Sequence, residues 1–122
     1  MADMDPIVAI VDDDDLVRRA LRRLVRSLSF HPADFDSGEA FLDSLDESTP
    51  FCVLLDLYMP DMNGLQVLAQ MRGRNLHVPT IIITGNSQPE MRSQCIEAGA
   101  PAYLQKPLDP DTVLSTIRSV TA

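Results

Sequence analysis

The chain has 122 residues, of which 45% are hydrophobic, and its 18 acidic and 10 basic residues give a formal net charge of −8. This length suits one domain with a hydrophobic core. The acidic balance argues against a domain that contacts nucleic acid directly, because that binding depends on clustered basic groups. No apolar run is long enough to cross a bilayer, and the first six residues lack the basic and apolar regions of a signal peptide.

Strand-like and helix-like segments alternate along the chain. Short apolar runs predict strands, a run that contains proline suits the edge of a sheet, and amphipathic stretches after capping residues predict helices. The strands are expected at Ile7–Val11, Phe30–Phe35, Phe51–Leu55, Pro79–Ile83 and Ala102–Gln105. The helices are expected at Leu16–Leu28, after Ser37, at Gly64–Arg72, at Pro89–Ala98 and from Asp109-Pro110 onward. Five such units predict an α/β fold, with a parallel sheet covered by helices on both faces.

Polar side chains follow the apolar strands. Asp12 and Asp13 come after the first strand, Asp56 after the third, Thr84 at the end of the fourth, and Lys106 after the fifth. Parallel connections bring the carboxyl ends of all strands to one rim of the sheet, where ligands of such sheets bind. We therefore expect these five residues to lie together.

The acidic cluster at that rim predicts a metal site. Of the four consecutive aspartates, Asp14 and Asp15 suit the start of a helix, whereas Asp12 and Asp13 suit a hard divalent cation such as Mg²⁺ or Ca²⁺. Lys106 is the only lysine of the chain and would supply a compact positive charge beside the carboxylates. Such a site suits attack of an aspartate oxygen on phosphorus, which forms an aspartyl-phosphate.

Cys52 and Cys95 lie in apolar segments without metal or redox spacing. We expect both to be reduced core residues, which predicts a cytoplasmic protein. His31 and His77 lie in loop-like contexts without metal-ligand spacing, so both are expected at the surface.

Several motifs in this order resemble the receiver domains of two-component response regulators, most closely those of nitrogen-fixation-type regulators. The motifs are Asp12-Asp13, the segment from Asp56 to Leu65, Thr84-Gly85, Ala98-Gly99-Ala100, and the segment from Tyr103 to Pro107. The resemblance covers essentially the whole chain. It implies a flavodoxin-like (βα)5 fold with strand order 2-1-3-4-5, and one receiver domain over residues 1–122 with residues 1–6 as a tail.

The resemblance also implies a role for each site residue. Asp56 would be the phosphoacceptor, and Mg²⁺ or Mn²⁺ would be held by Asp13, Asp56 and the backbone carbonyl of Tyr58, with Asp12 acting mainly through a water. Lys106 would pair with Asp56 and then with the phosphoryl group, which Thr84, Gly85 and the Tyr58 backbone would also bind. Thr84 and Tyr103 would form the switch pair, and the Lys106-Pro107 peptide would be cis.

The implied function is that of a phosphorylation-switched signalling module, not of an enzyme acting on other molecules. A sensor histidine kinase or a small phosphodonor would phosphorylate it, and the arginine-bearing face of the first helix is either solvated or a kinase-docking surface. The face made by the fourth helix, fifth strand and fifth helix would then control an output domain or partner, with a homodimer as one consequence. Tyr58 and Asn86 occupy positions that tune dephosphorylation in the family.

An alternative is an aspartate-nucleophile phosphotransferase or phosphatase of the haloacid-dehalogenase type. That family needs a second aspartate two residues after the nucleophile, where this chain has Tyr58. A nucleotide-binding enzyme is disfavoured because no glycine-rich loop follows the first strand.

Overall fold

A computed structural model describes residues 5–86 and 88–122, so residues 1–4 of the expected tail lie outside the described residues. Five parallel strands form one sheet in the order β2-β1-β3-β4-β5. The strands are β1 Ile7–Val11, β2 His31–Phe35, β3 Cys52–Asp56, β4 Thr80–Thr84 and β5 Ala102–Gln105. The helices are α1 Asp15–Ser27, α2 Gly38–Ser44, α3 Gly64–Gly73, α4 Pro89–Glu97 and α5 Pro110–Thr121. The predicted fold, strand order and element order are confirmed, and the predicted ends differ from the observed ends by at most one residue.

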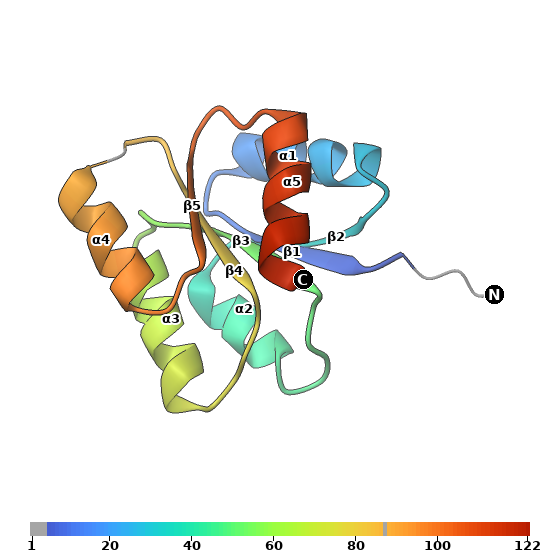
Figure 1. Cartoon of the computed structure of the whole chain (residues 1–122). Helices are drawn as coiled ribbons and strands as arrows, with labels where there is room; N and C mark the ends of the chain where they lie inside the picture. The colour runs from blue at the N-terminus through green and yellow to red at the C-terminus, as the bar shows by residue number, and fades with distance from the viewer. Residues whose placement is uncertain (1–4, 87) are drawn as a thin grey trace.

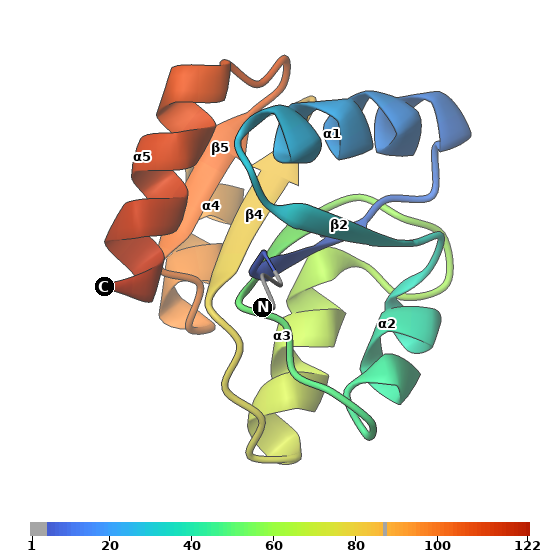
Figure 2. The ribbon, with the colours of Figure 1, turned by 90° about the vertical axis from the view of Figure 1, so that its right-hand side faces the viewer.

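The side chains of successive strand residues alternate between two cores. Helices α1 and α5 cover one face of the sheet, and α2, α3 and α4 cover the other (Figure 1). A quarter turn of the molecule shows α1 and α5 on the same side of the strands (Figure 2). Strands β3 and β4 are buried along their whole length, as expected for central strands of a parallel sheet covered on both faces.

Capping side chains begin most helices where the sequence predicts. Asp14 accepts hydrogen bonds from the amides of Leu16 and Val17 at the start of α1, so its expected capping role is confirmed. Ser37 caps α2, and Asn63 forms a capping box at α3. Each cap satisfies amides that would otherwise have no partner in the first turn.

Other sequence predictions also hold. Strand β2, which contains Pro32, pairs with β1 and lies at the sheet edge. Cys52 and Cys95 are buried free thiols, whereas His31 and His77 are exposed. Among the described residues, no helix is both long and apolar enough to cross a membrane.

Candidate functional site

Three carboxylates meet at the carboxyl rim of the sheet. Asp12 and Asp13 follow β1, and Asp56 is the last residue of β3. One carboxylate oxygen from each residue lies within 4.8 Å of the others. Asp12 and Asp56 are 1% and 5% exposed, while Asp13 is exposed to solvent. The predicted acidic cluster therefore exists, with two buried members and one accessible member.

Lys106 reaches this cluster from the end of β5. Its Nζ donates to Oδ2 of Asp12 at 2.8 Å and to Oδ1 of Asp56 at 3.2 Å. The alternation of side chains along a strand explains why Asp56 and Lys106 meet. Leu54 and Leu104 both face the core beneath α1 and α5. Asp56 and Lys106 each follow one of these leucines by two positions, so their side chains point to the same side of the sheet. The peptide bond between Lys106 and Pro107 is cis, as predicted.

Backbone hydrogen bonds beyond the strand ends fix the shape of the rim. The amide of Asp12 donates to the carbonyl of Phe35 at 3.2 Å, and the amide of Lys106 donates to the carbonyl of Thr84 at 2.8 Å. The Leu57 amide likewise donates to the carbonyl of Ile83 at 2.9 Å. The strand ends are thus tied together beneath the functional side chains.

Gly64 allows α3 to begin close against β3. Its amide donates to the carbonyl of Leu57 at 2.9 Å. A Cβ at position 64 would lie 2.8 Å from the backbone oxygen of Asp56, a separation that side chains do not tolerate. The loop after Asp56 can therefore turn back on the strand only with glycine here.

The local charges shift the pKa values of Asp56 and Lys106. Burial, and after it the charges of Asp12 and Asp13, raise the pKa of Asp56 to about 6, against the lowering effect of Lys106. Burial lowers the pKa of Lys106, but the hydrogen bond that Lys106 donates to Asp12 and the charge of Asp56 outweigh it, so the net pKa is raised. Three carboxylates facing one ammonium group leave the rim anionic, which suits a divalent cation.

Both carboxylate oxygens of Asp12 already have partners in the protein. Oδ1 accepts from the amide of Asp14 at 2.9 Å, and Oδ2 accepts from Lys106. Asp13 is the exposed member of the cluster. The three predicted metal ligands therefore differ in how freely they can bind an ion.

Thr84 ends β4 at the same rim and is fully buried. Its hydroxyl accepts from the amide of Asn86 at 3.1 Å and lies 3.3 Å from the Asn86 carbonyl, to which it donates. The adjacent Gly85 has open space around its Cα. The predicted phosphate-binding hydroxyl thus lies one strand away from Asp56, with its hydrogen bonds directed to its own loop.

Tyr103 lies in the core formed with α2, α3 and α4, paired in register with Ile82 of β4. It is 9% exposed, and its buried hydroxyl has no hydrogen-bond partner. The Tyr103 ring and its hydroxyl therefore lie in the interior of the protein in this structure.

Tyr58 and Asn86 follow β3 and β4 on the site side of the sheet, and both are exposed at the surface. The Tyr58 side chain is 45% exposed, so its ring does not belong to the core.

Sequence reasoning grouped Arg18 with the other arginines of the first helix. In the structure the Arg18 side chain is only 15% exposed and contacts the acidic loop, which no helical periodicity indicates.

Comparison with known proteins identifies the family of this chain. The model of the response regulator receiver domain family matches residues 8–118. Response regulator protein TodT of Pseudomonas putida is 35% identical over 119 residues, which are 98% of this chain and 52% of TodT. Transcriptional regulatory protein FixJ of Bradyrhizobium diazoefficiens is 31% identical, over 92% of this chain and 55% of FixJ. The crystal structure titled FixJ-N superposes with a TM-score of 0.88 at 30% identity, covering 99% of this chain and 95% of that one.

The chain belongs to the response regulator receiver domain family. Its similarity to FixJ confirms the resemblance inferred from the motifs. Receiver domains are signalling domains of two-component systems, and phosphorylation and Mg²⁺ binding are typical of them. The chain spans about half the length of the curated relatives it matches.

Proposed function

We propose that this receiver accepts a phosphoryl group on Asp56, in a Mg²⁺-dependent reaction, from a histidine kinase or a small-molecule phosphodonor. The observation that carries the proposal is the position of the Asp56 carboxylate. It lies at the end of β3, within 4.8 Å of the carboxylates of Asp12 and Asp13 and hydrogen-bonded to Lys106.

The reaction is a displacement at phosphorus. A carboxylate oxygen of Asp56 forms a bond to phosphorus, and the phosphorus–nitrogen bond of a phosphohistidine or the phosphorus–oxygen bond of a small donor breaks. The leaving group keeps the electron pair and takes a proton. Asp56 must be ionised to attack, and Lys106, which favours the ionised form, then turns from the carboxylate to the phosphoryl oxygens.

The cation would be Mg²⁺ or Mn²⁺. When bound, it neutralises the charge that builds between the carboxylate nucleophile and the phosphoryl group. Asp13, Asp56 and the backbone carbonyl of Tyr58 would ligate it. Asp12 would act mainly through water, which fits the partners that both of its oxygens already have.

Thr84, Gly85, Lys106 and the backbone of Tyr58 would bind the phosphoryl oxygens. For Thr84 this requires the hydroxyl to leave its bond to the Asn86 carbonyl and donate to the phosphoryl group instead. Tyr103 lies on the neighbouring strand, on the same side of the sheet, so a movement of Thr84 would change the room around its ring. The two residues would bias the α4-β5-α5 face between two states.

The partners follow from this assignment. The α4-β5-α5 face would control an output domain or a partner protein, with a phosphorylation-dependent homodimer as one form. The kinase would dock near α1, where Leu16 is 72% exposed. A groove of about 480 Å³ there runs beside Lys106. Its apolar lining residues are Val17, Ala20, Leu21, Leu24, Pro107 and Leu108.

The receiver would act only on its own phosphorylation and dephosphorylation, as one domain over residues 1–122 with a tail before β1. It would be cytoplasmic, without direct contact to nucleic acid or membrane. The haloacid-dehalogenase alternative gains no support, because Tyr58 is exposed where that chemistry needs an acid.

The test is intact-mass measurement after incubation with acetyl phosphate and Mg²⁺. One phosphoryl adduct is expected in the wild-type protein and none in Asp56→Asn. Asp61→Asn is the matched control, because Asp61 lies in the same loop, is exposed and has a φ of 67° that asparagine adopts readily. An adduct of wild-type yield in Asp56→Asn overturns the assignment.

A further inference from the structure

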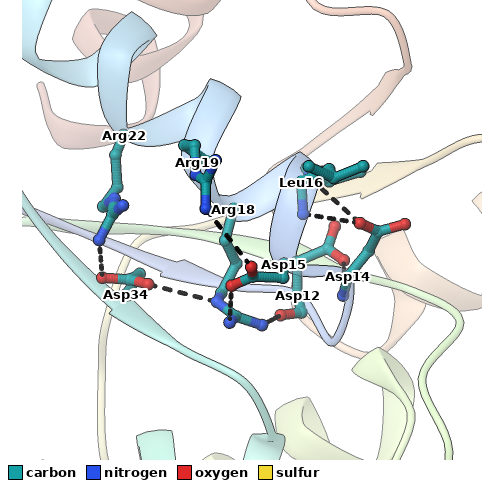
Figure 3. Close-up of polar contacts among 9 residues, drawn as sticks. Asp12, Asp14, Asp15, Leu16, Arg18, Arg19, Arg22 and Asp34 are labelled. Atoms are coloured by element: carbon teal, nitrogen blue, oxygen red, sulfur yellow. Dashed lines mark hydrogen bonds and ion pairs between the residues drawn. The ribbon is translucent and has the colours of Figure 1, made fainter.

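The guanidinium group of Arg18 joins three parts of the chain around the acidic loop (Figure 3). Nη1 donates to the backbone carbonyl of Asp12 at 2.9 Å, and Nη2 donates to Oδ1 of Asp15 at 2.8 Å. Nε donates to Oδ2 of Asp34, on strand β2, at 3.2 Å. Each nitrogen of the planar fork therefore has its own acceptor.

We propose that Arg18 is a positioning residue for the metal-binding loop, anchored to the sheet through Asp34. The proposal rests on the function proposed above, in which this loop helps to hold Mg²⁺. The hydrogen bonds of Arg18 go to the Asp12 backbone and to the side chains of Asp15 and Asp34, and not to the carboxylates of the acidic cluster. It acts on the backbone of Asp12, whose side chain in turn contacts Lys106 and the amide of Asp14.

Asp34 can hold the Arg18 side chain in place because its own backbone belongs to strand β2. It pairs in register with Ile10 of β1, two residues before the loop, and its other carboxylate oxygen lies 3.5 Å from Nη1 of Arg22. The side chains of Arg18 and Asp34 are 15% and 27% exposed, so their pairing is partly shielded from solvent. The Arg18 fork thus fixes the distance between β2, the loop carbonyl and the first turn of α1.

Lysine cannot replace this contact. An ammonium group on a flexible stem lacks the planar fork that reaches three acceptors in fixed directions. Residues that orient metal ligands typically change metal affinity 10- to 100-fold when they are removed. We expect a loss near the lower end of that range, because the Asp12 amide remains tied to Phe35.

The direction in which Mg²⁺ affinity changes when Arg18 is removed distinguishes a positioning role from a purely electrostatic one. Removing a positive charge near an anionic site strengthens the binding of a divalent cation if only Coulomb attraction matters. Removing a residue that positions the loop weakens it. Arg19 provides the matched control, since it is one residue away and carries the same charge, and among the described residues its only ion pair is with exposed Asp15, at 3.7 Å.

The experiment is a Mg²⁺ titration of the full chain, followed by amide NMR, for wild type, Arg18→Ala, Arg18→Lys, Arg19→Ala and Asp34→Ala. We expect the Kd for Mg²⁺ to rise about tenfold in both Arg18 variants, to rise less in Asp34→Ala, and to stay within twofold in Arg19→Ala. In the absence of metal, hydrogen exchange of the Asp14 amide should become faster in Arg18→Ala and not in Arg19→Ala.

Equal or tighter Mg²⁺ binding in Arg18→Ala overturns the inference, as does wild-type affinity in Arg18→Lys. If Arg18→Ala fails to fold, Asp34→Ala and Arg18→Lys decide the question. In the double variant Arg18→Lys with Asp34→Ala, the Kd for Mg²⁺ should be the same as in Arg18→Lys alone. A further, additive loss of Mg²⁺ affinity overturns the anchoring role of Asp34. Failure of the wild-type protein to bind Mg²⁺ is a different result, because it overturns the proposed function itself.

Discussion

Lys106 Nζ lies 3.2 Å from Oδ1 of Asp56, a residue 50 positions earlier in the chain. The pair joins the ends of β5 and β3, which are separated in the sheet by β4. The positive charge of Lys106 lowers the pKa of Asp56, which burial and the neighbouring carboxylates raise.

Replacing Lys106 by methionine should therefore raise the pKa of Asp56. Loss of a contacting opposite charge moves a carboxyl pKa by about one unit or more. The pH at which the rate of acetyl phosphate labelling reaches half its maximum should move upward by a similar amount. Labelling rates from pH 5 to 9, measured by intact mass, test this, and a profile with an unchanged midpoint contradicts it.

Replacing Asp56 by asparagine should stabilise the protein at neutral pH without divalent cations. The folded-state pKa of about 6 lies above the ordinary value of 3.8, so between these values the folded protein binds more protons than the unfolded chain. The free energy of unfolding therefore falls as the pH rises through this window. The loss caused by ionisation of Asp56 reaches its full size above about pH 6. Lys106 keeps Asp12 as a partner in the variant.

The expected gain for Asp56→Asn is on the order of 2 kcal/mol at pH 7.5, decreasing toward zero as the pH falls to 4. Urea unfolding at several pH values measures it, with Asp61→Asn as the control. A gain that is the same at pH 4 and pH 7.5 would show that ionisation of Asp56 does not cause it.

Addition of Mg²⁺ should raise the unfolding temperature of the wild-type protein. A ligand that binds only the folded state at ten times its Kd adds about 1.4 kcal/mol to the free energy of unfolding. The shift should be much smaller in Asp13→Ala, whose exposed side chain can be removed without disturbing the core. Equal shifts in the two proteins, measured by calorimetry in millimolar Mg²⁺, would exclude Asp13 as a ligand.

Replacing Tyr103 by phenylalanine should stabilise the unphosphorylated protein, because the buried hydroxyl has no partner. Removing such a group relieves a desolvation cost of about 1 kcal/mol. Urea unfolding of Tyr103→Phe measures the change. Thr84→Ser is measured in parallel, because it keeps the hydroxyl of residue 84 and removes only its methyl group. It tests whether the Thr84 hydroxyl alone sets the position of the Tyr103 ring. A destabilised Tyr103→Phe would mean that the hydroxyl does have a partner.

Much of the fold follows from local sequence. The central strands are continuous apolar runs, and Asp14, Ser37 and Asn63 begin their helices through short-range capping bonds. The site follows from topology, since a parallel sheet brings the residues after each strand to one rim. Arg18 and Tyr103 could not be placed this way. The first depends on an acceptor sixteen residues away on another element, and the second on how much space the core leaves around an aromatic ring.

Having one lysine in the chain makes the site chemically addressable. Apart from the α-amino group, Lys106 carries the chain's only primary amine, and its side chain is 23% exposed. Reductive methylation with ¹³C-formaldehyde would therefore place a single side-chain isotope label on the nitrogen atom that lies 3.2 Å from Oδ1 of Asp56. The chemical shift of that label would report the protonation of Asp56, cation binding and phosphorylation in one spectrum, without any engineered residue.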